Sequence, residues 1–259
     1  MMNQEQRAHL LRALAKNVRF DGRKALEYRQ ISVEYGISAS AEGSARVRIG
    51  GTEVIAGVKM EVATPYPDTP NQGNLMVNAE LLPLSNPKFE TGPPGEQATE
   101  LARVVDRAIR ESKCIDVHKL LIKSGEKAWG INIDICSIND EGNLQDAACL
   151  AALAALKDVR FPKISEHGKV DYDADKTDEK LPLGKEPIEV TVVKIGDQFL
   201  VDLLSDEEEA IEARLTVAVT EKNTVAALQK GGQAPLSLEE LDKMVEIAQK
   251  LAPTLRKAL

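Results

Sequence analysis

The sequence has few cysteines and no long apolar run. Its three cysteines, Cys114, Cys136 and Cys149, are odd in number and widely spaced, which excludes a disulfide framework and a pair of metal ligands. Each has apolar neighbours in the sequence, so we expect each thiol to act as a small buried hydrophobic group. No stretch approaches the roughly 18 consecutive apolar residues that span a bilayer, so we expect no membrane-spanning segment.

Positive charge is also in deficit. The chain has 33 Lys and Arg against 41 Asp and Glu, which gives a net charge of −8. A free-standing nucleic-acid-binding protein needs a broad basic surface, so any RNA binding must use a local basic patch or a partner. The beginning of the sequence lacks the basic and then apolar layout of a secretory signal peptide, and we therefore expect a cytoplasmic protein.

Motifs for nucleotides, zinc and serine nucleophiles are absent as well. There is no GxxxxGK[ST] loop, GxGxxG turn, HExxH helix or GxSxG elbow. Asp171, Asp173 and Asp175 have the spacing of a calcium-binding loop. The pattern fails at both discriminating positions, because Lys176 replaces the Gly of that loop and Pro182 its bidentate Glu. We therefore expect no bound metal and no cofactor.

The most informative segment that is present spans residues 100–111. At about 100° per residue, its apolar side chains fall on one side of a helix, and Arg103, Arg107 and Arg110 fall on the other. Arginines one turn apart can bind successive phosphates of a strand, because guanidinium donors match phosphate oxygens. The alternative is a solvated face that neutralises itself through ion pairs within the helix. The candidate pairs are Glu100–Arg103, Asp106–Arg110 and Arg107–Glu111.

The remaining patterns predict an α+β fold. Alternating apolar residues indicate strands, and apolar residues at helical spacing indicate helices. In the first part we predict helices over 4–16 and 146–157, and strands over 31–37, 45–49, 53–62, 75–84, 120–123 and 129–138. Gly50 and Gly51 between two of these strands are typical of a hairpin turn.

The second part of the chain repeats the order of strands followed by a helix. We predict strands over 188–195, 199–201, 211–219 and 224–228 and a closing helix. Ser237 and Glu240 form a capping box at the start of that helix. Because the order occurs twice, we predict one α+β unit over residues 1–259 with two similar halves. These halves cover about 20–165 and about 187–253, and a charged linker at about 166–186 joins them.

Five segments together carry a family resemblance. They are Asp21-Gly22-Arg23, Gly43-Ser44-Ala45, residues 68–75, residues 80–84 and the arginine segment 100–110. The chain resembles the RNase PH family, and within it the non-catalytic RNase PH-type subunits of the archaeal exosome, from about residue 17 to about residue 253. The resemblance implies the RNase PH-like (ribosomal-protein-S5-domain-2-like) fold, with two pseudo-symmetric halves of β-sheet and helix.

The resemblance also implies partners and an RNA-binding role. This chain and a catalytic RNase PH-type paralogue would alternate in a trimer of heterodimers, with S1 and KH or zinc-ribbon cap proteins on one face. Such a ring degrades single-stranded RNA from 3′ to 5′ with phosphate. The counterparts of Arg103 and Arg107 contact RNA phosphates near the active site of the catalytic neighbour. Arg110 is the weaker RNA-binding candidate, because pairing with Asp106 offers it a structural role.

Three differences from the active members imply that this chain has no catalytic residues. Active members carry paired arginines at the start of the long helix, where this chain has Glu96 and Gln97. Their phosphate-binding Gly-Ser/Thr-Arg turn corresponds to residues 142–146, which contain no arginine. Of their two acids six residues apart, Glu208 remains but Arg214 replaces the second. An active exoribonuclease and an α+β scaffold without an RNA role stay open as alternatives.

Overall fold

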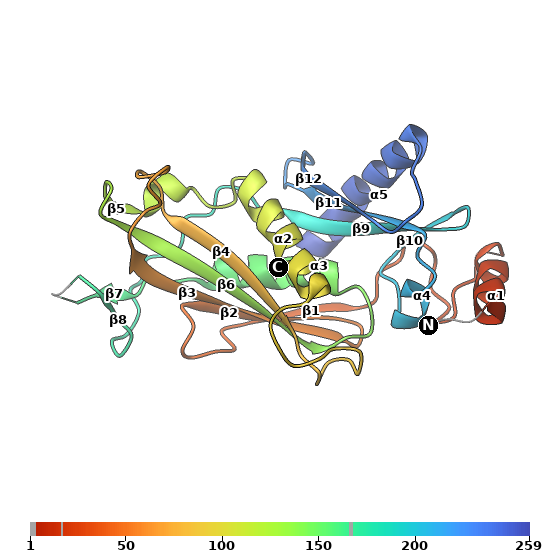
Figure 1. The fold of residues 1–259 in the computed structure, drawn as a ribbon, viewed down its shortest axis with the longest axis horizontal. Coiled ribbons are helices and arrows are strands. Elements are labelled where there is room, and N and C mark those ends of the chain that lie inside the picture. The colour runs from red at the N-terminus through yellow and green to blue at the C-terminus, as the bar shows by residue number, and fades with distance from the viewer. Residues whose placement is uncertain (1–3, 17, 166–167) are drawn as a thin grey trace.

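Two β-sheets with helices between and beside them form the structure (Figure 1). It is a computed structural model, and it describes residues 4–16, 18–165 and 168–259. The larger sheet contains β1 (Ile31–Tyr35), β2 (Gly43–Ile49), β3 (Thr52–Ala63), β4 (Asn74–Leu81), β5 (Leu121–Lys123) and β6 (Lys127–Asn139). Its strand order is β1-β2-β3-β6-β4, with β5 paired to β6. Only β4 runs parallel to its neighbour among these described strands.

The smaller sheet is formed by the second part of the chain. Its strands are β9 (Ile188–Ile195), β10 (Gln198–Val201), β11 (Ala213–Val219) and β12 (Val225–Gly231). They are all antiparallel and have the order β10-β9-β11-β12. A short additional pair, β7 (Lys163–Ile164) and β8 (Val170–Asp171), lies where the sequence predicted no strand, and β8 falls within the predicted charged linker.

The helices connect and cover the two sheets. They are α1 (Gln4–Leu14), α2 (Glu96–Glu111), the 3₁₀ turn η1 (Val117–Leu120), α3 (Leu144–Asp158), α4 (Ser205–Glu208) and α5 (Leu238–Arg256). The helix α3 packs against β2 and β3 of the larger sheet and β9 of the smaller one, and Figure 1 shows it between them. Its Ala- and Leu-rich residues from Gln145 to Leu156 are all buried. It therefore joins the two sheets in one core.

The predicted α+β fold and its elements are confirmed, with corrections at several ends. The hairpin turn at Gly50 and Gly51 joins β2 to β3, and Gly50 has the positive φ of 59° that such a turn requires. The arginine helix begins four residues earlier than predicted, at Glu96, since Gly95 supplies its extended N-cap. The strand β4 ends at Leu81 rather than at residue 84.

The cysteine prediction is right for two residues and wrong for the third. Cys114 and Cys149 are buried and free, and burial raises the pKa of the Cys114 thiol to about 12. Cys136 is only half-buried, because it lies on β6 beside the edge strand β4, whose polar side chains leave that face partly open to water.

Candidate functional site

The helix α2 has the two faces that the sequence predicted. Its buried residues are Ala98, Leu101, Ala102, Val104, Val105, Ala108 and Ile109. This face packs against β4, α3 and β12, which removes its apolar surface from water. Arg103, Arg107 and Arg110 are all exposed on the opposite side. The structure therefore presents the arginine row on the surface of the molecule.

The structure forms one of the three pairs expected within α2. Arg110 Nη2 lies 2.7 Å from Asp106 Oδ1, and it also donates a hydrogen bond of 3.1 Å to the Leu75 carbonyl oxygen. The hydrogen bond to Asp106 raises the pKa of Arg110 above its usual value. The Arg110 guanidinium thus has a structural role at the start of β4.

The other two predicted pairs are wrong, because residues distant in the sequence take their place. Glu100 accepts a hydrogen bond of 2.6 Å from Arg214 on β11 rather than from Arg103. Arg107 donates 2.9 Å to the side-chain oxygen of Gln229 on β12. Within the described part of the chain, the Arg103 side chain has no ion pair or hydrogen bond. Both Arg103 and Arg107 are therefore free of carboxylate partners there.

A groove runs along these arginines. Its volume is about 550 Å³, and its lining comprises Pro94, Gly95, Glu96, Thr99, Glu100, Arg103, Val104, Arg107 and Gln229. Phosphate oxygens can accept bidentate hydrogen bonds from guanidinium groups. Arg103 and Arg107 stand one helical turn apart on the groove wall, so two successive phosphates of a strand can bind there.

A separate cavity of about 340 Å³ brings together positions to which the family resemblance assigned a role in catalysis. Gln97, Asn143, Glu208 and Arg214 all line it, although they come from α2, the start of α3, α4 and β11. Glu96 lies in the neighbouring arginine groove instead. These positions belong to three distant segments of the sequence, and the fold places four of them around one cavity.

The Glu208 carboxylate occupies the start of helix α3. Its Oε1 accepts a hydrogen bond of 2.8 Å from the backbone N–H of Asn143, the N-cap residue. Burial raises the pKa of Glu208 to about 7. Because free N–H groups and the helix dipole attract anions, a helix N-terminus is a common phosphate-binding position. In this chain a side-chain acid of the protein itself takes that place.

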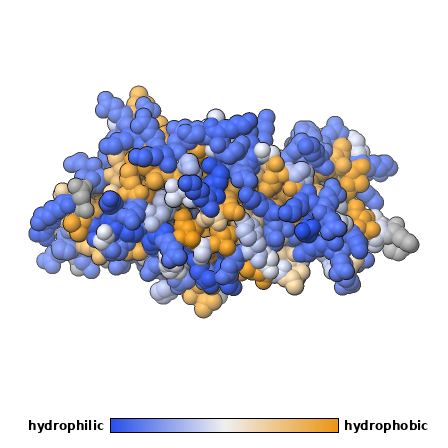
Figure 2. All heavy atoms as spheres, turned by 180° about the vertical axis from the view of Figure 1, so that it is seen from behind, coloured by the Kyte–Doolittle hydropathy of each residue, from blue (hydrophilic) through white to orange (hydrophobic). Residues whose placement is uncertain are grey.

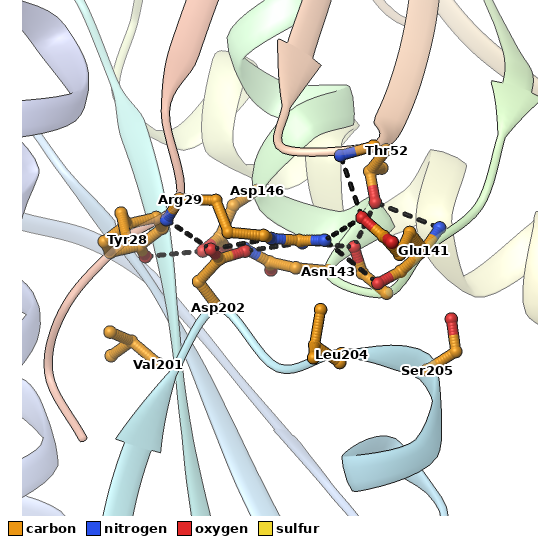
Figure 3. Close-up of polar contacts among 12 residues, drawn as sticks. Tyr28, Arg29, Thr52, Glu141, Asn143, Asp146, Val201, Asp202, Leu204 and Ser205 are labelled. Atoms are coloured by element: carbon orange, nitrogen blue, oxygen red, sulfur yellow. Dashed lines mark hydrogen bonds and ion pairs between the residues drawn. The ribbon is translucent and has the colours of Figure 1, made fainter. Parts of the chain in front are cut away.

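Another arginine, Arg29, is bound to Asp202 in the lining of this cavity and is already neutralised. Arg29 Nη2 lies 2.7 Å from Asp202 Oδ1, and its Nη1 lies 3.2 Å from Glu141 Oε2. Asn143 donates a further bond of 3.0 Å to Asp202, and Figure 3 shows these side chains pointing toward one another. Burial disfavours the ionised carboxyl, but the Arg29 guanidinium outweighs this and holds the pKa of Asp202 below its usual range.

The sequence did not indicate Arg29, Asp202 or Gln229. Arg29 and Asp202 are 173 residues apart, and neither belongs to a recognisable motif. Gln229 sits in a plain strand pattern of β12, where nothing distinguishes it from a solvent-facing amide. Only the packing of β12 beside α2 brings it to Arg107.

The predicted absence of a metal site and of membrane spans can be compared with the structure only where it describes the chain. There, no group of three or more His, Cys, Asp or Glu side chains could hold a metal ion. Among the same described residues, no helix combines the length and apolar character needed to cross a bilayer.

Comparisons with known proteins identify the family. Residues 27–162 match domain 1 of the 3′ exoribonuclease family (RNase PH), and residues 185–250 match domain 2. The chain is 44% identical to the exosome complex component Rrp42 of Methanothermobacter thermautotrophicus, over 92% of this chain and 88% of that protein. It is 42% identical to the Rrp42 component of Pyrococcus furiosus, over 98% and 92%.

Solved structures agree with the sequence comparisons. A chain of the Archaeoglobus fulgidus exosome with RNA bound to the active site superposes with a TM-score of 0.89 and 41% identity, covering 97% of this chain and 96% of that one. The rice protein Rrp46 shares the fold, with a TM-score of 0.69 at 18% identity over 92% and 97% of the two chains. The predicted RNase PH-like fold is therefore confirmed, and this chain belongs to the 3′ exoribonuclease (RNase PH) family, in which it is similar to the archaeal exosome component Rrp42.

Proposed function

We propose that this chain is a non-catalytic subunit of an archaeal exosome, a phosphorolytic 3′→5′ exoribonuclease. In this role it supports the assembly and activity of a catalytic RNase PH-type paralogue in a trimer of heterodimers. It also binds RNA backbone phosphates near the active site of that neighbour. Cap proteins with S1 and KH or zinc-ribbon domains complete the complex, which works in the cytoplasm. The exosome names of its relatives support this role.

The observation that carries RNA binding is the state of Arg103 and Arg107. Both are exposed on the wall of one groove, and the nearby acids Glu100 and Asp106 are bound to Arg214 and Arg110 instead. Phosphate contacts hold a strand without reading its sequence, which suits the degradation of any RNA. Arg110 extends the row but has weaker access, because Asp106 and Leu75 bind its guanidinium.

The absence of catalysis follows from charge at the second cavity. Phosphorolysis needs an inorganic phosphate beside the RNA end, and the turn at residues 142–146 that would bind it contains no arginine. Arg29 is bound to Asp202 and cannot replace the missing arginine. Arg214 stands in place of the second acid and binds Glu100. The site therefore lacks both an arginine for the phosphate co-substrate and the second acid that would assist proton transfer.

RNA binding is tested by replacing both arginines in the ring reconstituted with the catalytic paralogue. The variant Arg103→Ala/Arg107→Ala should bind single-stranded RNA at least about tenfold more weakly, because two charge-assisted contacts are lost. The slope of log affinity against log salt should fall by about 1.4, at about 0.7 for each phosphate contact of a single strand. Fluorescence anisotropy in phosphate-free buffer measures both quantities without degradation.

The matched control is Lys222→Ala/Lys250→Ala. It removes the same charge at two exposed positions that have no ion pair in the described structure. This control should leave the affinity and the salt slope near those of the unmodified ring. Unchanged binding by the arginine variant in an intact ring would reject RNA positioning and favour a scaffold without an RNA role.

Catalysis is tested with the purified chain alone. Incubated with single-stranded RNA and phosphate, it should release no nucleoside diphosphate, whereas the reconstituted ring should do so. Restoring the acid with Arg214→Asp should not produce activity, since the anion-binding arginines remain absent. Liquid chromatography of the products measures the result. Nucleoside diphosphate from the chain alone would favour the alternative, an active exoribonuclease.

A further inference from the structure

Exposed aromatic side chains are rare on this protein, and one of them lies beside the arginine row. We propose that Tyr66 is a base-stacking platform that continues the RNA path beyond Arg110. The proposal deepens the proposed function, because it rests on RNA following the arginine row. It adds a contact to the bases, whereas the arginines contact phosphates. The ligand is a nucleobase of single-stranded RNA.

Tyr66 is the exposed aromatic whose side chain has no bond or ring contact within the described structure. Aromatic residues make up only 3% of the chain, and Tyr66 is 53% exposed. The other exposed aromatics, Phe20, Tyr35 and Tyr172, are engaged. Their partners are respectively the ring of His9, the Leu259 carbonyl oxygen and the Lys59 ammonium. An uncovered tyrosine ring offers its face to an incoming base.

Hydrogen bonds at the start of β4 link Arg110 to the loop that contains Tyr66. The Arg110 guanidinium donates to the Leu75 carbonyl oxygen at the start of β4. The neighbouring Asn74 amide donates 3.2 Å to the carbonyl oxygen of Thr64, two residues before Tyr66. The hydrogen bond to Asp106 is the main cause of the raised pKa of Arg110, and the charges of Glu111 and Tyr66 add to it.

The backbone at Tyr66 is held before any ligand binds. Pro65 and Pro67 flank it; each proline fixes its own φ, and Pro67 restricts Tyr66 to extended backbone. The Tyr66 carbonyl oxygen accepts a hydrogen bond of 3.0 Å from the backbone N–H of Thr69. A pre-ordered loop loses little conformational entropy when a base stacks on it.

The spacing of the row fits a continuous track. Arg103 and Arg110 are seven residues apart on α2, which is about 10 Å along the helix axis. A strand whose phosphates follow Arg103 and Arg107 and continue past Arg110 would be directed toward the loop of Tyr66. Proteins that bind single strands without sequence preference combine such basic grooves with aromatic faces, because every base has a face that stacks.

The test compares Tyr66→Ala with the matched control Tyr66→Phe in the reconstituted ring, in phosphate-free buffer. Tyr66→Ala should weaken binding of single-stranded RNA by about tenfold, as expected for the loss of one stacked base. Tyr66→Phe should bind like the unmodified ring, since it keeps the aromatic face. The salt slope should be the same in all three, because no phosphate contact is lost.

A second measurement locates the base. RNAs with an abasic nucleotide at successive positions should show one position at which Tyr66→Ala causes no further loss. At that position, 2-aminopurine fluorescence should be quenched on binding the unmodified ring. This fluorescence readout decides the question even if Tyr66→Ala fails to assemble.

The outcomes separate this inference from the proposed function. Normal binding by Tyr66→Ala, together with weak binding by Arg103→Ala/Arg107→Ala, overturns the stacking role and leaves RNA positioning intact. Equal losses in Tyr66→Ala and Tyr66→Phe indicate a hydroxyl contact and also overturn it, as does the absence of quenching at every position. If neither the tyrosine nor the arginine variant weakens binding, both proposals fail.

Discussion

At the scale of single residues, an acid lies buried in the core of this molecule. Glu189 on β9 is 1% exposed, and Gln145 donates 3.2 Å to its Oε2. Its Oε1 has no hydrogen-bond partner within the described structure. Burial raises the pKa of Glu189 to about 8, because an ionised carboxyl is poorly stabilised away from water. Folding therefore favours the protonated form of this side chain.

The sign of the pH effect follows from this raised pKa. The unfolded chain releases the Glu189 proton near pH 4.5, whereas the folded chain keeps it until about pH 8. The contribution to stability is fully present at acid pH and is lost as pH rises between these values, at about 1.4 kcal/mol per unit. The raised pKa values of Asp146 and Glu208 act in the same direction.

We predict that Glu189→Gln loses less stability than the unmodified chain between pH 5 and pH 8. The neutral amide of the variant cannot ionise, so the contribution of residue 189 to the pH dependence of stability disappears. The contributions of Asp146 and Glu208 are present in both proteins and cancel when the two stability curves are compared. The difference should reach a few kcal/mol by these linkage magnitudes. Denaturant unfolding at several pH values measures it. Parallel stability curves for the two proteins would contradict a protonated Glu189.

At the scale of elements, the helix α3 holds the molecule together through very close packing. A side-chain Cβ at Gly43 on β2 would lie 2.4 Å from the Ala155 carbonyl oxygen and 2.6 Å from the Val159 backbone nitrogen. Backbone atoms cannot move aside as a flexible side chain can. The glycine in this strand therefore allows β2 to approach the helix that both sheets share.

We predict that Gly43→Ala lowers the free energy of unfolding by about 1–3 kcal/mol, the usual range for overpacking a core. The matched control is Gly57→Ala on the adjacent strand β3. An added Cβ there would meet only the Ala41 Cβ at 3.7 Å, an ordinary contact, so the control should change stability little. Urea unfolding of both variants measures the difference. Equal stabilities would show that β2 does not depend on contact with α3.

At the scale of the whole molecule, one core and several outer surfaces define the chain. The main hydrophobic cluster contains buried residues from both sheets, and we propose that the halves at about 20–165 and 187–253 fold as one unit. Figure 2 shows apolar side chains in several patches among hydrophilic ones on one face. Exposed apolar residues also lie on outer strands, among them Tyr35 on β1, Met76 on β4 and Leu228 on β12.

These outer strands carry unpaired backbone groups and apolar side chains, which promote association with other chains. We predict that the chain expressed alone forms mixed assemblies, whereas co-expression with the catalytic paralogue produces one species containing three copies of each. Native mass spectrometry of the co-purified complex measures the composition. A stable monomer that ignores the paralogue would contradict the proposed ring.

The sequence by itself determined features that depend on neighbours within a few residues. The hairpin at Gly50 and Gly51, the apolar helix α3 and the two faces of α2 follow from local spacing. The capping box of α5 follows in the same way, and the structure contains it at Ser237 and Glu240. The family could be recognised too, because its short motifs lie in continuous segments.

Tertiary structure alone decided which charged groups are free. Sequence spacing pairs Glu100 with Arg103, but folding brings Arg214 from 114 residues away to Glu100. Folding likewise carries Gln229 to Arg107 and Glu208 to the first residues of α3. The physical reason is that hydrogen bonds and ion pairs depend on distance in space, and β11, β12 and α4 reach α2 and α3 only after both sheets have packed on one core.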